Sequence, residues 1–374
     1  MQLKIILAKI IRHSLFWTKI FPIKNNKIIF FSYQGKNYSC NPKYIAERLA
    51  YDKEADNLKI LYAFLDTDKY IGKLPANIEI IKYGSLSFFY HYFTAKIIIT
   101  NSSNLPYLPK KKKQLLINTW HGGGAYKTEL YDLDLTHFKN ENVDYFISSS
   151  TVFHKLLKSS TGLSDSKFLD VGMPRNDFLI HYTPVQISKI KSKMRLEHNV
   201  NYLLFAPTYR EKGRKIIYPD FEKILKVFSQ RFSGRWKLIL RAHYDCKNEF
   251  LDMGLDYIDL SSFDDMQEVL AVSDAVITDY SSLIWDYSFL KKPCFLYTPD
   301  LELYEAERGF YYPLPTWGFP YAPDMDGLCK SIIDFDQEEF CKKMEEHHKN
   351  LGSYEHGNAT EKVVAVILDS IKRG

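Results

Sequence analysis

Four short polar segments carry side chains that suit phosphate chemistry, and each directly follows an apolar run typical of a buried strand. They are Thr119 to Gly124, Phe205 to Arg210, Leu240 to His243 and Thr278 to Ser282. The carboxyl ends of parallel strands meet at one edge of a sheet, where α/β proteins bind ligands. We therefore expect these segments to build the functional site.

His121 is the candidate general base, because an imidazole can take a proton from a hydroxyl near neutral pH. Gly122 and Gly123 follow it, and a glycine run lets the backbone approach a ligand and present its N–H groups. The plain alternative is a turn histidine beside a tight loop.

Three cationic side chains are candidates for binding phosphate: Arg210, Arg241 and His243. Arg241 and His243 alternate along an extended segment, so both face the same side of it. Each residue alone is unremarkable, but together they indicate a cationic pocket.

Ser281 and Ser282 precede an apolar segment with the pattern of a helix. The first turn of a helix presents unpaired N–H groups at its positive end, which favours an anion. Plain N-caps have the same residue types, so this signal alone is weak. Asp279 is expected to orient the loop rather than to act as a base.

Apolar strand-like runs alternate with helical segments in two series, separated by a polar, lysine-rich stretch at 180–193. This pattern predicts an α/β protein with two doubly wound parallel-sheet domains facing a cleft. The strand-like runs are 27–32, 58–65, 78–81, 96–100, 114–119 and 143–148, then 202–205, 236–240, 257–260, 275–278 and 294–297.

The predicted domains follow from these two series. Residues 25–185 form the acceptor-side domain and 186–350 the donor-binding domain. Residues 351–374 form a C-terminal helix, expected to pack back on the first domain. Residues 1–24 mix apolar side chains with lysines and an arginine, which predicts a basic amphipathic helix in a membrane interface. The alternative is a helix packed on its own domain.

Composition narrows the function classes. The 374 residues carry a net charge of +5, and no motif of a nucleic-acid-binding fold is visible. The 5 cysteines contain no Cys-x-x-Cys pair, which fits a reducing compartment and argues against a structural zinc site. Asp132 and Asp134 form an Asp-x-Asp, but the motif does not close a strand, so we expect no metal and no cofactor.

In order and spacing, these segments resemble the CDP-glycerol glycerophosphotransferase family of teichoic-acid-type primases and polymerases. The resemblance covers nearly all of 27–370 and includes further matching segments at Asn41 to Lys43, Gly172 to Asp177 and Tyr304 to Tyr311. It implies a GT-B-like fold and metal-independent transfer of glycerol phosphate from CDP-glycerol or a related CDP-polyol. It also implies a lipid-linked glycan acceptor and peripheral attachment to the inner face of the cytoplasmic membrane.

We expect in-line phosphoryl transfer with His121 and His243 as the catalytic residues. His121 deprotonates an acceptor hydroxyl, and His243, Arg210, Arg241, Ser281 and Ser282 stabilise the phosphates. Gly122, Gly123, Asp279 and Arg308 are further candidates for binding the substrate or donor, with Arg308 near the donor's nucleoside. The chain departs from the family where His121 is followed by Gly122-Gly123-Gly124-Ala125-Tyr126-Lys127 instead of Gly-Thr-Pro-Leu-Lys, which alters the acceptor-side turn.

Two other functions stay open from the residues. A GT-B glycosyltransferase acting on a nucleotide-sugar would use the same fold and pocket. A membrane-associated scaffold would need the N-terminal helix but not His121. The acceptor, the polyol, a teichoic acid or capsule pathway and the oligomeric state are not specified by the sequence.

Overall fold

The computed structural model describes residues 18, 20–102, 108–124, 126–128, 143–208, 210, 215–242 and 256–373. Their contacts divide the chain into two compact units. The first unit contains the residues up to His121, those from Val143 to Asp177 and those from Ser353 onward. The second contains Gly122–Thr128 and Phe178–Gly352. The domain limits expected from the sequence stay predictions.

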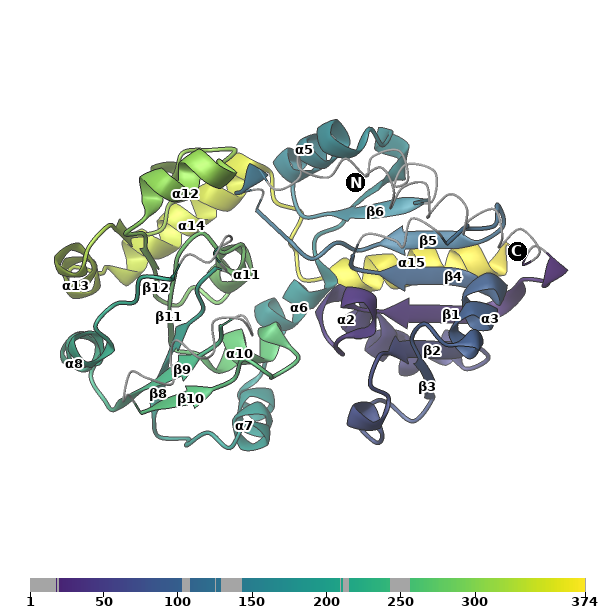
Figure 1. Ribbon diagram of the computed structural model, residues 1–374, viewed down its shortest axis with the longest axis horizontal. Helices are drawn as coiled ribbons and strands as arrows, with labels where there is room; N and C mark the ends of the chain where they lie inside the picture. Colours follow the sequence, from purple (N-terminus) through teal and green to yellow (C-terminus); the bar gives the residue numbers. More distant parts are fainter. Residues whose placement is uncertain are drawn as a thin grey trace. The chain divides into compact units, whose positions relative to one another are not determined.

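The first unit is built on a seven-stranded parallel sheet with the order β3-β2-β1-β4-β5-β6-β7 (Figure 1). Its central strands are almost fully buried and rich in isoleucine, as expected for a sheet covered on both faces. The strands are β1 (Lys24–Phe31), β2 (Lys59–Phe64), β3 (Ile78–Lys82), β4 (Ala95–Thr100), β5 (Leu115–Asn118), β6 (Tyr145–Ser148) and β7 (Phe168–Asp170).

Helices of the first unit connect these strands and cover the sheet. The C-terminal helix α15 (Ala359–Lys372) packs on α2 (Cys40–Ala50) within this unit. Asp177 accepts hydrogen bonds from the N–H groups of Ala359 and Thr360, which caps the start of α15. The other helices are α3 (Leu86–Thr94) and α5 (Thr151–Thr161), while α6 (Pro174–His181) begins in this unit and ends in the second.

The second unit is built on a six-stranded parallel sheet with the order β10-β9-β8-β11-β12-β13. Its strands are β8 (Asn201–Phe205), β9 (Trp236–Leu240), β10 (Tyr257–Asp259), β11 (Ala275–Thr278), β12 (Cys294–Tyr297) and β13 (Tyr321–Ala322). Its helices are α7 (Pro184–Lys193), α8 (Phe221–Phe232), α10 (Met266–Val272), α11 (Leu283–Ser288), α12 (Leu301–Arg308), α13 (Met325–Ile333) and α14 (Gln337–Leu351).

These two sheets confirm the predicted fold class. Only β7 and β13 had no counterpart among the predicted strands, because runs of three and two residues are too short to show a pattern. The predicted N-terminal helix lies outside the described residues. Within the described part of the chain, no helix is both long and apolar enough to cross a membrane.

Each sheet has one point where the strand order reverses. In the first sheet this switch lies between β1 and β4, and in the second between β8 and β11. Doubly wound sheets bind ligands outside the carboxyl ends of the strands at such points. We therefore expect the ligand-binding residues of each unit to lie near its switch point.

Candidate functional site

His121 lies beside the switch point of the first sheet and contacts Asn101 at the end of β4. It follows β5, its side chain is exposed, and its Nδ1 lies 2.7 Å from the backbone carbonyl oxygen of Asn101. A carbonyl oxygen can only accept, so Nδ1 carries the proton and donates it. In the neutral imidazole, Nε2 is then the basic nitrogen. This tautomer is the one required of a base that acts through Nε2.

Two aromatic rings fix the plane of the His121 imidazole. The Trp120 ring lies 4.7 Å from it at an angle of 30°, and the Tyr33 ring meets it edge-on at 5.5 Å. Asn101 links the two strands at the switch, because its side-chain oxygen accepts the Tyr33 N–H at 2.8 Å. Residues from the segments that follow β1, β4 and β5 therefore all contact the imidazole of His121.

The backbone around His121 is strained. Trp120, Tyr33, Gln34 and Cys40 all have positive φ values, of 53°, 45°, 56° and 61°. Such conformations are costly for residues other than glycine and cluster at functional sites. Contacts with the surrounding residues must therefore offset the energetic cost of this backbone conformation.

Asn41 supplies much of that support, and its role was not recognised from the sequence. It is fully buried, and its side-chain amide donates to the carbonyl oxygens of Thr119 and Trp120 at 3.0 and 3.1 Å. Its side-chain oxygen accepts the N–H of Arg175 at 3.1 Å. The matching segments at 41–43 and 172–177 thus hold the turn that precedes His121.

The second switch point is occupied by a buried carboxylate. Asp279 follows β11 and accepts the N–H of Thr208, which follows β8, at 2.9 and 3.1 Å. It also accepts the N–H of Tyr280 at 2.7 Å. Asp279 therefore joins the two strand ends on either side of the switch.

Arg210 is also buried at this switch point, where two carboxylates neutralise its charge. Its guanidinium pairs with Asp279 at 2.9 Å and with Asp300 at 2.8 and 3.1 Å. Burial opposes ionisation of Arg210, but these carboxylates raise its pKa above the ordinary value. In turn, Arg210 outweighs the burial of Asp300 and lowers the pKa of that carboxyl. This arrangement indicates that Arg210 holds together the segments that follow β8, β11 and β12.

Two aromatic rings complete this cluster. The guanidinium of Arg210 lies 5.1 Å from the Tyr280 ring centre and 5.0 Å from that of Tyr304, within the range of cation–π attraction. The Tyr280 hydroxyl donates to Asp300 at 2.9 Å. Burial raises the pKa of Tyr280, so this hydroxyl stays protonated. The contacts of Asp300 and Tyr280 were not predicted from the sequence, because their partners are 20 or more residues away.

Ser281 and Ser282 precede α11 at the same edge of the second sheet, and both are partly exposed. The Ser282 hydroxyl makes no capping hydrogen bond to the helix. A plain cap is therefore not its role here.

Arg241 follows β9, and its guanidinium donates to the carbonyl oxygens of Leu260 and Phe263 at 3.1 and 2.5 Å.

The remaining candidates fall into two groups. Gly122 and Gly123 belong to the second unit, as does Arg308, which ends α12. His243 lies outside the described residues, as do Asp132 and Asp134. Among the residues that the structure describes, no cluster of three or more histidine, cysteine, aspartate or glutamate side chains is arranged to hold a metal ion.

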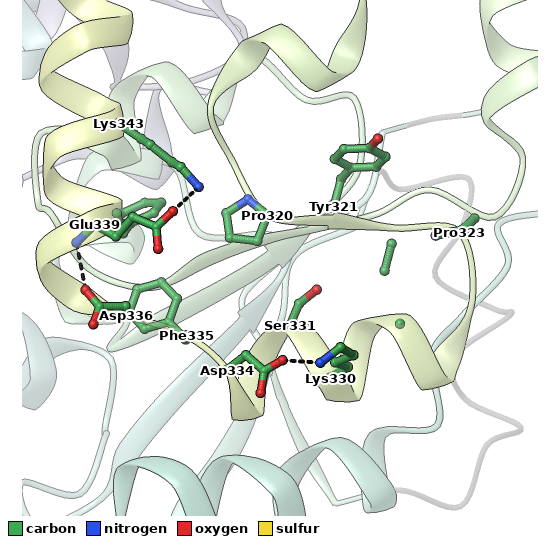
Figure 2. A pocket seen from close by; sticks show the side chains of 13 residues that line it. Pro320, Tyr321, Pro323, Lys330, Ser331, Asp334, Phe335, Asp336, Glu339 and Lys343 are labelled. Carbon is green, nitrogen blue, oxygen red and sulfur yellow. Dashed lines mark hydrogen bonds and ion pairs between the residues drawn. The ribbon is translucent and has the colours of Figure 1, made fainter.

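A hollow of about 390 Å³ lies beside the edge strand β13 of the second unit. Figure 2 shows the side chains that line it. Four of its charged side chains form ion pairs, Lys330 with Asp334 and Lys343 with Glu339, and Asp336 caps α14. None of the candidate site residues lines it. We therefore assign it no part in the chemistry.

A larger hollow, of about 1340 Å³, lies at the amino edge of the first sheet. Its lining is strongly basic and contains one carboxylate, Asp144, which pairs with Lys110 at 2.8 Å. Phe21 also lines it, and the Phe21 carbonyl oxygen accepts a hydrogen bond from Lys111. The basic lining residues are Lys96, Lys110, Lys111, Lys112, Lys113 and Arg373.

Two doubly wound parallel sheets, each with polar groups at its switch point, define a ligand-binding α/β protein of the GT-B-like class. A model of the CDP-glycerol:poly(glycerophosphate) glycerophosphotransferase family matches residues 13–369, and the chain belongs to this family.

Curated relatives and a solved structure agree with this assignment. The teichoic acid poly(glycerol phosphate) polymerase of Staphylococcus epidermidis is 29% identical over 94% of this chain and 51% of its own length. This chain thus spans about half of that relative. The teichoic acid ribitol-phosphate primase of Bacillus spizizenii is 27% identical over 95% of this chain and 94% of its own length. The wall teichoic acid polymerase TagF is 26% identical, with a TM-score of 0.85 over 99% of this chain and 96% of that chain.

Proposed function

We propose that this chain transfers a glycerol-phosphate or similar polyol-phosphate unit from a CDP-activated donor to a hydroxyl of a membrane-linked cell-wall or capsule glycopolymer. One observation carries the proposal: an exposed His121 whose Nδ1–H donates to the Asn101 carbonyl, so that Nε2 is the basic nitrogen. Family membership supports the donor class. A TagF structure obtained after a soak with CDPG, 26% identical to this chain, supports it too.

In the proposed reaction, Nε2 of His121 removes the proton of the acceptor hydroxyl. The acceptor oxygen then forms a bond to the β-phosphorus of the donor, and the bond from that phosphorus to the bridging oxygen breaks, which releases CMP. Such transfers depend mainly on positioning and on stabilising the spread negative charge.

The charge stabilisation is assigned to the second unit. Ser281 and Ser282, with nearby backbone N–H groups, would donate to the diphosphate. Arg241, His243 and Arg308 are the proposed cationic contacts. Asp279 and Arg210 hold the strand ends that carry this pocket, and we propose that no metal ion takes part.

The polyol and the acceptor belong to the same proposal. The relatives named above act in glycerol phosphate and in ribitol phosphate polymer synthesis, so both polyols are candidates. The altered turn after His121 concerns the acceptor more than the donor, because it follows the proposed base directly.

We further propose that the protein lies on the cytoplasmic face of the membrane as a peripheral protein. The basic hollow of the first unit supports this, since Lys112 and Lys113 are exposed beside it and Ile20 is 75% exposed near the start of the described chain. Lysines next to exposed apolar groups are attracted to anionic lipid surfaces.

The activity is tested by incubating the pure protein with CDP-glycerol, CDP-ribitol and several nucleotide-sugars, with and without a lipid-linked acceptor. Release of CMP that depends on the acceptor and survives EDTA is the expected result. Release of a nucleoside diphosphate from a nucleotide-sugar would show a glycosyltransferase instead. Inhibition by EDTA that magnesium reverses would overturn the metal-free mechanism, and no turnover with any donor would overturn the proposed activity.

A further inference from the structure

The chain passes from the first unit to the second directly after His121. We call Gly122–Gly124 and Tyr126–Thr128 the glycine strap, because all these residues pack within the second unit. The strap begins one peptide bond after the candidate base. Whatever fixes the strap therefore restrains the backbone of His121.

Gly123 is seated on a buried tryptophan of α11. A β-carbon at position 123 would lie 2.3 Å from Cδ1 and 2.8 Å from Nε1 of Trp285, so only glycine fits. Trp285 is fully buried and follows Ser282 by one helical turn. The candidate donor serines therefore directly precede the helix on which the strap is seated.

Tyr126 anchors the strap a second time. Its buried hydroxyl lies 2.8 Å from Nε2 of His347 on α14, and its ring lies 4.6 Å from the Trp317 ring. Burial lowers the pKa of His347 to about 4 and raises that of Tyr126. At neutral pH the protonated tyrosine therefore donates to a neutral imidazole.

The end of the strap pairs with the segment that follows α12. Lys127 forms an antiparallel bridge with Phe310, and the Tyr311 N–H donates to the Tyr126 carbonyl oxygen at 3.0 Å. The Thr128 hydroxyl donates to the carbonyl oxygen of Arg308. The strap is thus joined to α11, which follows the candidate donor serines, and to the segment after α12, which follows the candidate Arg308.

We propose that the glycine strap positions His121 for transfer, and that Gly123, Trp285, Tyr126 and His347 are positioning residues for the reaction. This inference rests on the proposed function. It follows that the glycines after His121 serve packing as well as ligand approach. A small displacement of a catalytic group costs a large factor in rate, so loosening the strap lowers kcat before it affects donor binding.

The sharpest test compares two tyrosine-to-phenylalanine variants of the second unit. Tyr126→Phe removes only the hydroxyl that donates to His347. Tyr202→Phe is the matched control, because Tyr202 is also fully buried and its hydroxyl bonds the backbone of Glu197 at 2.7 and 3.2 Å. Both variants should lose similar thermal stability, but only Tyr126→Phe should lower kcat, by about fivefold or more. The dissociation constant of CDP should stay within about twofold in both.

Three further variants test the same strap and its anchor on His347. Gly123→Ala should lower kcat at least about tenfold, since the new methyl group must displace the strap from Trp285. His347→Gln, which keeps a hydrogen-bond acceptor for Tyr126, should retain more kcat than His347→Leu.

Strap variants with wild-type kcat, or with losses of kcat matched by equal losses of CDP affinity, would overturn this inference alone. A wild-type protein that turns over no donor would overturn the proposed function and this inference with it.

Discussion

Nδ1 of His121 donates to the carbonyl oxygen of Asn101, 2.7 Å away, at the switch point of the first sheet. A backbone carbonyl cannot change its protonation state, so it fixes the tautomer of the imidazole without adding a second titrating group. The tautomer of His121 is therefore determined by the backbone at the ends of β4 and β5.

Replacing Arg210 should lower the stability of the second unit. Arg210→Met leaves Asp279 and Asp300 buried without their cation, which should lower the free energy of unfolding by about 3–5 kcal/mol. Lys330→Met, which breaks the exposed pair with Asp334, should cost less than about 1 kcal/mol. Denaturant titrations measure both. Equal effects of the two variants would show that the buried cluster is not a stabilising centre.

Ser282→Ala should impair catalysis without affecting stability. The Ser282 hydroxyl makes no capping bond, so its loss should leave the melting temperature unchanged while kcat/KM falls about tenfold to hundredfold. His243→Ala should have a similar effect on kcat/KM. Ser85→Ala provides the opposite control, because the Ser85 hydroxyl accepts the Phe88 N–H at 3.1 Å. That variant should lose about 1 kcal/mol of stability and keep its activity. Wild-type kinetics of Ser282→Ala would remove this serine from the donor pocket.

Membrane binding should depend on the basic surface of the first unit. Deleting residues 1–17 should weaken binding to vesicles that contain anionic lipid while the protein stays folded. The deletion stops there because Thr18 is buried and the Phe21 ring packs edge-on against Tyr90 at 5.8 Å. In the full-length chain, replacing Lys112 and Lys113 together by glutamate should also weaken binding.

The control for these charge reversals is the same pair of changes at the exposed residues Lys155 and Lys226. Vesicle sedimentation separates the variants, with about 1 kcal/mol expected per lysine near the membrane surface. A truncated protein that aggregates, together with an intact chain that does not bind vesicles, would favour a helix packed on its own domain.

Stability should fall as the pH drops from about 6.5 to about 4. Burial lowers the pKa of His347 from 6.5 to about 4 and that of His348 to about 3, so in this range the unfolded chain binds protons that the folded chain does not. The stabilisation is complete above pH 6.5 and is lost toward pH 4. For His347 alone the shift corresponds to about 3 kcal/mol. His347→Gln should flatten the pH dependence, and an unchanged slope would contradict the burial argument.

The sequence predicted both sheets because buried parallel strands are long, apolar and regularly spaced. It also indicated which strand ends carry polar side chains. It did not reveal Asn41, Asn101 or Asp300, because their roles depend on partners far away in the chain. Nor did it reveal that Arg210 is engaged by two carboxylates, since an isolated arginine after a strand looks the same whether it binds a phosphate or an aspartate.

The glycine strap illustrates the same limit. A run of three glycines indicates close approach of some group, but the sequence does not say which one. The structure fills the space beside Gly123 with Trp285, a residue more than 160 positions away. Packing between distant segments is therefore the information that the local pattern lacks.

The role of His121 as the base is tested most directly by measuring acceptor-dependent CMP release from CDP-glycerol by wild type and His121→Ala. CDP affinity and melting temperature are measured on the same two proteins. Because His121 is exposed and removes only a proton, kcat should fall by at least about a hundredfold while CDP affinity and melting temperature stay at their wild-type values. A His121→Ala protein that keeps more than about a tenth of the wild-type kcat would contradict the account.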